Sequence, residues 1–170
     1  MRPCRLIPLL ALALVFPPLA AADPAARVEV VYVEPEKFTD VRNGYTQTDS
    51  ARVFYLAALR RYIEQQAGRR LTDGDTLRVT ITNVELAGDY EARRPSVTNV
   101  RIIREVNPAR IDLSFRLARA DGTVLAEGER RLRSTGYPVG VGIDPADPLR
   151  YEKVLLDDWL RQDLTPAGSR

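Results

Sequence analysis

The chain lacks histidine altogether, and its only cysteine is Cys4, close to the N-terminus. Zinc sites built on histidine and cysteine are therefore excluded, as are nucleophilic mechanisms that need an imidazole or a thiol. The glycines at Gly136, Gly140 and Gly142 have neither the spacing nor the following lysine of a phosphate-binding loop. We therefore predict no cofactor, no metal site and no catalytic residue.

The chain also has almost no excess of charge, with 25 basic and 23 acidic side chains among its 170 residues. The two extra positive charges are both arginines of the first 22 residues, so the rest of the chain is formally neutral. Nucleic acids and anionic membranes attract a net basic face. We therefore expect no nucleic-acid partner, and we interpret arginine pairs such as Arg60-Arg61 as solvated or ion-paired side chains.

Residues 1–22 have the layout of a secretory signal peptide. Two arginines precede an apolar run from Leu6 to Phe16, and small residues follow it. This run is shorter than the roughly 20 apolar residues that a membrane-spanning helix needs. We predict cleavage between Ala20 and Asp23, no transmembrane segment in the mature chain, and a product located in the periplasm or outside the cell.

The remaining sequence predicts one α+β domain over residues 27–164 and a flexible tail at 165–170. Apolar residues at helical spacing predict two amphipathic helices, and alternating patterns predict five strands. The order β-α-β-β-β-β-α favours a two-layer sandwich, in which a mostly antiparallel sheet of about five strands carries both helices on one face. In chain order the elements are a strand at Val28–Val33, a helix from about Thr48 to Gly68, strands at Thr76–Leu86, Val97–Val106, Arg110–Arg119 and Thr123–Arg133, and a helix from Pro148 to about Leu164.

Local signals refine these elements. The first helix is expected to bury an apolar line and to stop at Gly68 in a left-handed conformation. In the strand at Thr76–Leu86 the apolar residues stand at odd positions up to Ile81 and at even positions from Val84. A bulge near Asn83 would explain this shift. Asp121-Gly122 predicts a two-residue type I′ turn, in which Ala120 pairs with Thr123. The expected apolar line of the first helix is Val53, Leu56, Leu59, Ile63 and Ala67.

The same turn predicts a register for the two strands that it joins. Counting back from it places Arg116 opposite Glu127 and Asp112 opposite Arg131, which gives two pairs of opposite charge. Leu113 falls opposite Arg130, which is an exception on the apolar face.

Charged and aromatic residues gather near the ends of several predicted elements, where binding residues are often found. From them we define a candidate interaction surface. It consists of Glu36, Lys37, Phe38, Asp40, Asp89, Tyr90, Arg101 and Arg104.

Several of these segments resemble an uncharacterised family of secreted proteobacterial proteins, domain of unknown function (DUF) family 3016. The resemblance is most specific in Pro35–Val41, with weaker blocks at Leu86–Glu91, Arg101–Arg104 and Tyr151–Lys153 with Asp158-Trp159. It implies an exported single-domain protein, and it implies no activity, ligand or catalytic residue.

Three functions are consistent with these observations. We favour a non-enzymatic interaction or accessory module of the cell envelope, whose partner is an unidentified envelope protein or ligand. One alternative is a hydrolase of envelope glycans that would use two carboxylates on either side of a cleft. The other binds a small anionic ligand or a lipid through Arg101 and Arg104. The candidate carboxylates of the hydrolase are Glu36, Asp40, Asp89 and Glu152.

Overall fold

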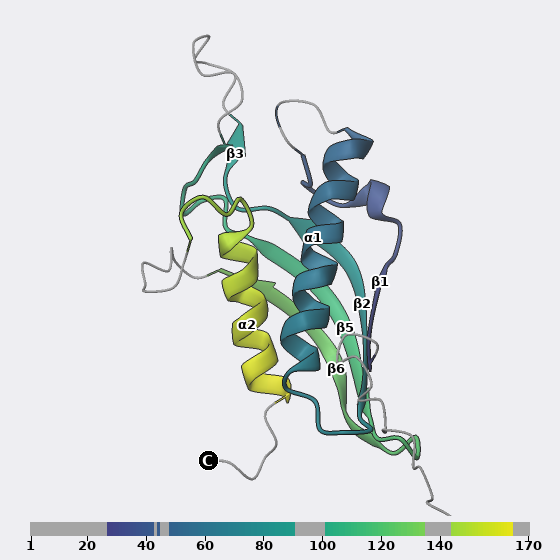
Figure 1. Ribbon diagram of the computed structural model, residues 1–170. Coiled ribbons are helices and arrows are strands. Elements are labelled where there is room, and N and C mark those ends of the chain that lie inside the picture. The colour runs from purple at the N-terminus through teal and green to yellow at the C-terminus, as the bar shows by residue number, and fades with distance from the viewer. Residues whose placement is uncertain (1–26, 43, 45–47, 91–100, 135–143, 165–170) are drawn as a thin grey trace, which may run out of the picture.

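The computed structural model describes residues 27–42, 44, 48–90, 101–134 and 144–164. A four-stranded sheet runs through the molecule in the order β1-β2-β5-β6, and two helices cover one of its faces (Figure 1). Strand β1 is parallel to β2, and the other pairs are antiparallel. The predicted α+β class is therefore confirmed. The elements of these two layers are β1 Val28–Tyr32, α1 Asp49–Gly68, β2 Thr76–Glu85, β5 Arg110–Ala118, β6 Val124–Arg133 and α2 Arg150–Leu164.

A second, smaller sheet and a short 3-10 helix complete the fold. The helix η2 spans Pro35–Lys37, and strands β3 (Asp89–Tyr90) and β4 (Arg101–Ile102) pair with each other outside the main sheet. The strand predicted at Val97–Val106 is therefore wrong as a member of the main sheet, where β2 pairs directly with β5. Its described part forms a strand only at Arg101–Ile102, so the main sheet has four strands.

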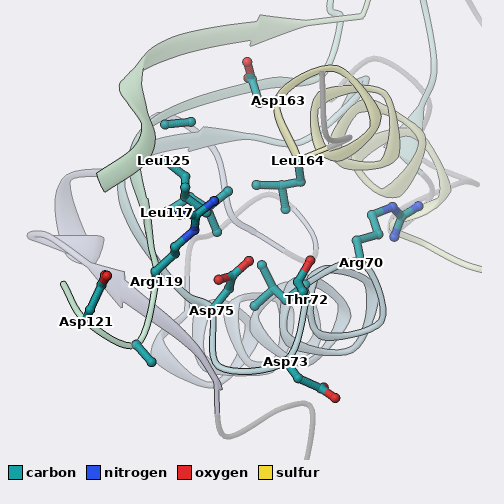
Figure 2. A pocket seen from close by; sticks show the side chains of 13 residues that line it. Arg70, Thr72, Asp73, Asp75, Leu117, Arg119, Asp121, Leu125, Asp163 and Leu164 are labelled. Atoms are coloured by element: carbon teal, nitrogen blue, oxygen red, sulfur yellow. The ribbon is translucent and has the colours of Figure 1, made fainter. Parts of the chain in front are cut away.

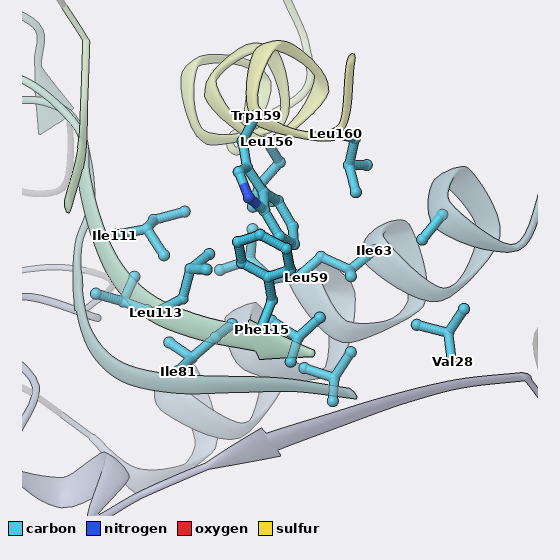
Figure 3. Packing of buried hydrophobic residues seen from close by; sticks show 14 of the residues in the cluster. Val28, Leu59, Ile63, Ile81, Ile111, Leu113, Phe115, Leu156, Trp159 and Leu160 are labelled. Atoms are coloured by element: carbon cyan, nitrogen blue, oxygen red, sulfur yellow. The ribbon is translucent and has the colours of Figure 1, made fainter. Parts of the chain in front are cut away.

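The core lies between the sheet and the two helices (Figure 3). Phe115 of β5 meets Trp159 of α2 edge to face, with ring centroids 5.7 Å apart. Arg130 lies on the same face of β6, where its guanidinium covers the ring of Phe115 and binds Asp163 of α2. The exception in the predicted apolar pattern is therefore an arginine that links the sheet to α2.

Helix α1 begins as predicted, because the Thr48 hydroxyl accepts a hydrogen bond from the Ala51 amide. Two other expectations for this helix are wrong. Gly68 is the last helical residue, and Arg69 follows it with φ −73°, so the helix ends without a left-handed glycine. Val53 is 67% exposed, because the apolar residues of the first turns are not all on the face that meets the sheet.

Helix α2 begins later than the predicted Pro148, at Arg150. Asp147 still caps the turn that leads into the helix, because its carboxylate accepts a hydrogen bond from the Leu149 amide at 2.9 Å. The capping residue is thus correctly identified from the sequence, but it stabilises the turn before the helix.

The bulge in β2 is confirmed, since the pairing of β2 with β5 shifts between Ile81 and Asn83. The extra residue moves later side chains to the other face, so Val84 is buried like Ile81.

The predicted two-residue turn between β5 and β6 is wrong, although the predicted strand pairs are correct from Leu117–Ala126 onward, away from the turn. Arg119, not Ala120, is opposite Thr123, and only Gly122 has a positive φ, at 85°. This is the three-residue connection that combines a type I turn with a left-handed glycine. Ala118 then pairs with Val124 and Leu117 with Ala126, so Leu125 is an extra residue that restores the predicted pairs.

The predicted signal peptide, with Cys4, and the predicted tail at 165–170 lie outside the described residues, as do Gly136, Gly140 and Gly142. Within the residues that are described, neither helix combines the length and the apolar character needed to cross a membrane.

Candidate functional site

A network of charged side chains forms where β2 ends and the small β3–β4 sheet begins. Asp40 continues the main sheet there, because its amide donates to the Val84 carbonyl and its carbonyl accepts from the Leu86 amide. The Asp40 side chain is buried, and both of its oxygens accept hydrogen bonds from Arg101, at 3.0 and 3.2 Å. This two-pronged geometry is the strongest form of arginine–carboxylate pairing.

Arg101 also binds the backbone around it. Its Nη1 donates to the Gly88 carbonyl at 2.9 Å, and its Nη2 donates to the Arg42 carbonyl at 3.0 Å. Burial alone would lower the pKa of Arg101, but the hydrogen bonds from its guanidinium to Asp40 raise this pKa above the ordinary value. Arg101 therefore remains charged and joins three chain segments at the start of the β3–β4 sheet.

Gly88 permits this close approach of the chain segments. Its φ is 78°, and a Cβ atom added there would lie 2.5 Å from the Ile102 carbonyl oxygen. Its amide donates to the Asn107 carbonyl, which ties the segment before β3 to the segment after β4. A side chain at this position would force the two segments apart.

Arg42 extends the network toward solvent. Its Nε donates to Asp40 at 3.1 Å, and its Nη2 donates to Asp89, whose side chain is about half exposed. The guanidinium groups of Arg42 and Arg101 both lie near the ring of Tyr90, at 5.8 and 4.8 Å from its centroid. Favourable cation–π contact therefore adds to the ion pairs.

Glu152, from the first turn of α2, holds the same chain segment from the inside. It is 1% exposed, and its Oε1 accepts a hydrogen bond from the Ala87 amide at 2.7 Å. Its Oε2 is buried and has no hydrogen-bond partner among the described residues. Burial raises the pKa of Glu152, although the Ala87 hydrogen bond and the charge of Arg101 oppose that rise.

Tyr55 of α1 lies close enough to this network to be affected electrostatically by its members. Its pKa is raised, first by burial and then by Tyr90, while the charge of Arg101 opposes the change. The network thus lies at the end of the molecule where α1 begins and the β3–β4 sheet projects (Figure 1).

The structure brings together Asp40, Asp89, Tyr90 and Arg101 from the predicted surface. The other members of that surface are Phe38, Glu36, Lys37 and Arg104. Phe38 is buried against Tyr32, so its ring belongs to the core rather than to an accessible surface. Glu36 and Lys37 are exposed on η2, and Arg104 is exposed after β4.

Sequence reasoning missed Arg42, which links Asp40 to Asp89. It also missed three exposed apolar side chains near the network: Val53 and Phe54 on α1, and Val106 before β5. Alternation could not identify them, because Val53 matches a core position of a helix and Val106 matches a strand residue. The only available signal for Arg42 was its closeness in sequence to Asp40.

The charged side chains of this network pair with one another and thereby link separate segments of the chain. The Asp40 carboxylate is held by two guanidiniums, and Asp89 by one of the same two. No group of three or more acidic, histidine or cysteine side chains suited to a metal ion occurs in the described part of the chain. The ion pairs and hydrogen bonds of Arg42 and Arg101 join the small sheet to the end of the domain.

One comparison with known proteins matches the chain to a protein family. The model of a protein family described as "Protein of unknown function (DUF3016)" matches residues 26–162, which is most of the chain. No curated protein matches the sequence.

Proposed function

Because the chain belongs to the DUF3016 family, whose description assigns no role, we propose a function from the surface of the molecule itself. The protein is a non-enzymatic interaction module, exported to the periplasm as an accessory component of the cell envelope. It binds a partner protein through the end of the domain that carries the β3–β4 sheet. The signal-like sequence of residues 1–22 supports the location.

The observation that carries this proposal is the anchoring of the small sheet by Arg101. A pair of two-residue strands buries too little apolar surface to be stable alone. Here Arg101 and Glu152 together hold the segment from Leu86 to Gly88 by side-chain hydrogen bonds. A projecting element that is held rigidly at its base loses little conformational entropy when it binds, which favours affinity.

Exposed apolar side chains near the same network give the surface a means of binding. Phe54 is 59% exposed, and its ring contacts that of Tyr55. Val106 is 75% exposed and directly precedes Asn107, whose carbonyl binds Gly88. Aromatic and aliphatic anchors surrounded by charged side chains are typical of protein interfaces.

The two alternative functions have less support. A glycan hydrolase needs one carboxyl group able to give up a proton and another placed across a cleft. Asp40 and Asp89 are instead bound by Arg42, and neither lines the cavity beside the β5–β6 turn or the smaller one beside the start of β1. An anionic ligand at Arg101 would have to displace Asp40 and several backbone carbonyls.

Site-specific crosslinking in the cells that produce the protein tests the proposal. A photoreactive amino acid replaces Phe54 or Val106 in turn, and Thr82, which is exposed on the helix-free face of the sheet, is the matched control. We expect one discrete adduct of the same mass from both test positions and none from position 82. Adducts that are absent everywhere, or equally frequent at all three positions, would contradict the proposal.

A further inference from the structure

A cavity of about 700 Å³ lies at the end of the main sheet opposite the β3–β4 sheet. The loop between α1 and β2, the β5–β6 turn and the last turn of α2 surround it (Figure 2). Its volume is within the range of small-molecule sites in proteins, roughly 300–1,000 Å³. None of the residues of the Arg101 network lines it, so it is a separate site.

Leucine side chains form the apolar part of the wall. Leu71, Leu117 and Leu164 are buried and come from the loop after α1, from β5 and from the end of α2. Leu125 joins them because it is the extra residue of the β6 bulge, and it is 41% exposed. Bulges commonly redirect a side chain toward a binding site.

Three of the six charged side chains of the wall have ion-pair partners among the described residues. Asp163 binds Arg130, and Arg70 lies 3.5 Å from Asp157. Asp73 is 3.7 Å from Arg27, the residue before β1. Asp121 keeps its charge: the hydrogen bond from the Thr123 amide lowers its pKa, and the charge of Arg119 acts in the same direction.

Figure 2 shows Asp121 apart from Leu117 and Leu164, so two opposite charges without an ion pair are left beside the leucines. Asp75 is half-buried and Arg119 is exposed, and neither forms an ion pair with any residue that the structure describes. Figure 2 shows both side chains reaching toward the space that Leu117 and Leu164 border. The cavity thus offers one carboxylate, one guanidinium and an apolar wall.

We propose that this cavity binds a short apolar peptide with free termini. The peptide ammonium group pairs with Asp75, its carboxylate pairs with Arg119, and its apolar side chains pack on the leucines. A ligand with both charges fits better than a fatty acid or an alkylamine, because each of those would leave one wall charge without a partner. This inference does not depend on the function proposed for the Arg101 network.

Calorimetric titration of the purified protein with four forms of dileucine tests the inference. The four probes are the free dipeptide, the N-acetylated form, the C-amidated form and the doubly blocked form. We expect saturable binding of the free dipeptide and a loss of affinity of about twofold to fivefold when either end is blocked, the range expected for partly exposed ion pairs.

Substitutions assign each charge to its partner. Asp75→Asn is expected to abolish the preference for a free N-terminus while keeping the preference for a free C-terminus, and Arg119→Gln is expected to do the reverse. Leu125→Ser is expected to weaken binding of the free dipeptide. Val124→Ser is the matched control, because Val124 is similarly exposed at 38% but does not line the cavity.

Three results would overturn the inference. The first is no saturable binding of the free dipeptide up to about 10 mM, which is weaker than a specific small-ligand site. The second is equal affinity for the free and the doubly blocked forms. The third is binding that appears only after residues 165–170 are removed, which would assign the cavity to the protein's own C-terminal segment.

Discussion

Arg101 and Asp40 are 61 positions apart in the sequence, yet the two terminal nitrogens of the arginine bind the two carboxylate oxygens, at 3.0 and 3.2 Å. Both side chains are largely buried. The pair joins the segment after η2 to strand β4, and it shares Asp40 with Arg42. Its geometry explains why a very short sheet can project from the end of the domain.

Breaking this pair by removing one partner is expected to be strongly destabilising. Arg101→Gln leaves the Asp40 carboxylate buried with less compensation, and we expect a loss of about 3 kcal/mol in the free energy of unfolding. Urea denaturation followed by circular dichroism measures it. Arg78→Gln is the control, because the Arg78–Glu29 pair is mostly exposed and should contribute less than about 1 kcal/mol. Equal losses in the two variants would contradict this account.

Gly88→Ala is expected to destabilise the protein by about 2 kcal/mol or more, because it combines an unfavourable φ with a clash. The added Cβ would lie 2.5 Å from the Ile102 carbonyl oxygen. Gly122→Ala is a matched comparison, since Gly122 has a similar positive φ but open space around it. It should cost about 1 kcal/mol. Thermal denaturation of both variants would show whether the steric clash matters, and indistinguishable losses would mean that it does not.

Glu152→Gln tests the effect of the buried carboxyl group on stability. The folded state raises the pKa of Glu152, so it binds this proton more tightly than the unfolded chain does. The contribution to stability is therefore complete below the ordinary glutamate pKa, about 4.5, and it is lost as pH rises through the folded pKa. Glutamine keeps an oxygen that can accept the Ala87 hydrogen bond but does not ionise.

We accordingly expect the stability of Glu152→Gln relative to wild type to increase from pH 4.5 upward. Urea denaturation at a series of pH values measures this difference. Glu127→Gln, at an exposed position of β6, provides the control and should show no such trend. A difference between Glu152→Gln and wild type that is constant with pH, or that falls as pH rises, would show that burial does not govern the Glu152 ionisation.

Trp159 is the only tryptophan, and its buried Nε1 has no hydrogen-bond partner in the described part of the chain. Trp159→Phe keeps an aromatic ring against Phe115 and removes that unsatisfied donor. We expect a loss of stability of no more than about 1.5 kcal/mol, compared with about 3–5 kcal/mol for Trp159→Ala. Chemical denaturation followed by circular dichroism separates these cases, and similar losses in both variants would refute the assignment of ring packing as the main contribution.

Local patterns predicted the sheet and its register well, because strand alternation and the Asn83 bulge are properties of neighbouring residues. The β5–β6 pairs are correct although the predicted turn is wrong, since the three-residue turn and the extra Leu125 compensate for each other. Alternation cannot distinguish a strand in the main sheet from a separate two-residue strand, so the placement of β4 was missed.

The candidate site was only partly predictable for a related reason. Asp40, Asp89, Tyr90 and Arg101 were identified because charged and aromatic residues stood near element ends. Their mutual contacts depend on long-range packing, which no local pattern contains. The burial of Phe38 was missed because a loop aromatic can pack under its loop as readily as it can face a ligand.

Amide hydrogen exchange in Arg101→Gln, compared with wild type and Arg78→Gln, tests most directly whether Arg101 holds the β3–β4 sheet as a binding element. We predict that Arg101→Gln accelerates exchange at the Gly88 amide by at least about tenfold, equivalent to about 1.4 kcal/mol of local stability, and that the centres of β2 and β5 still exchange more slowly than Gly88 does. Arg78→Gln should leave Gly88 unchanged. Unchanged exchange at Gly88 in Arg101→Gln, or an equal acceleration at Gly88 in Arg78→Gln, would contradict the account.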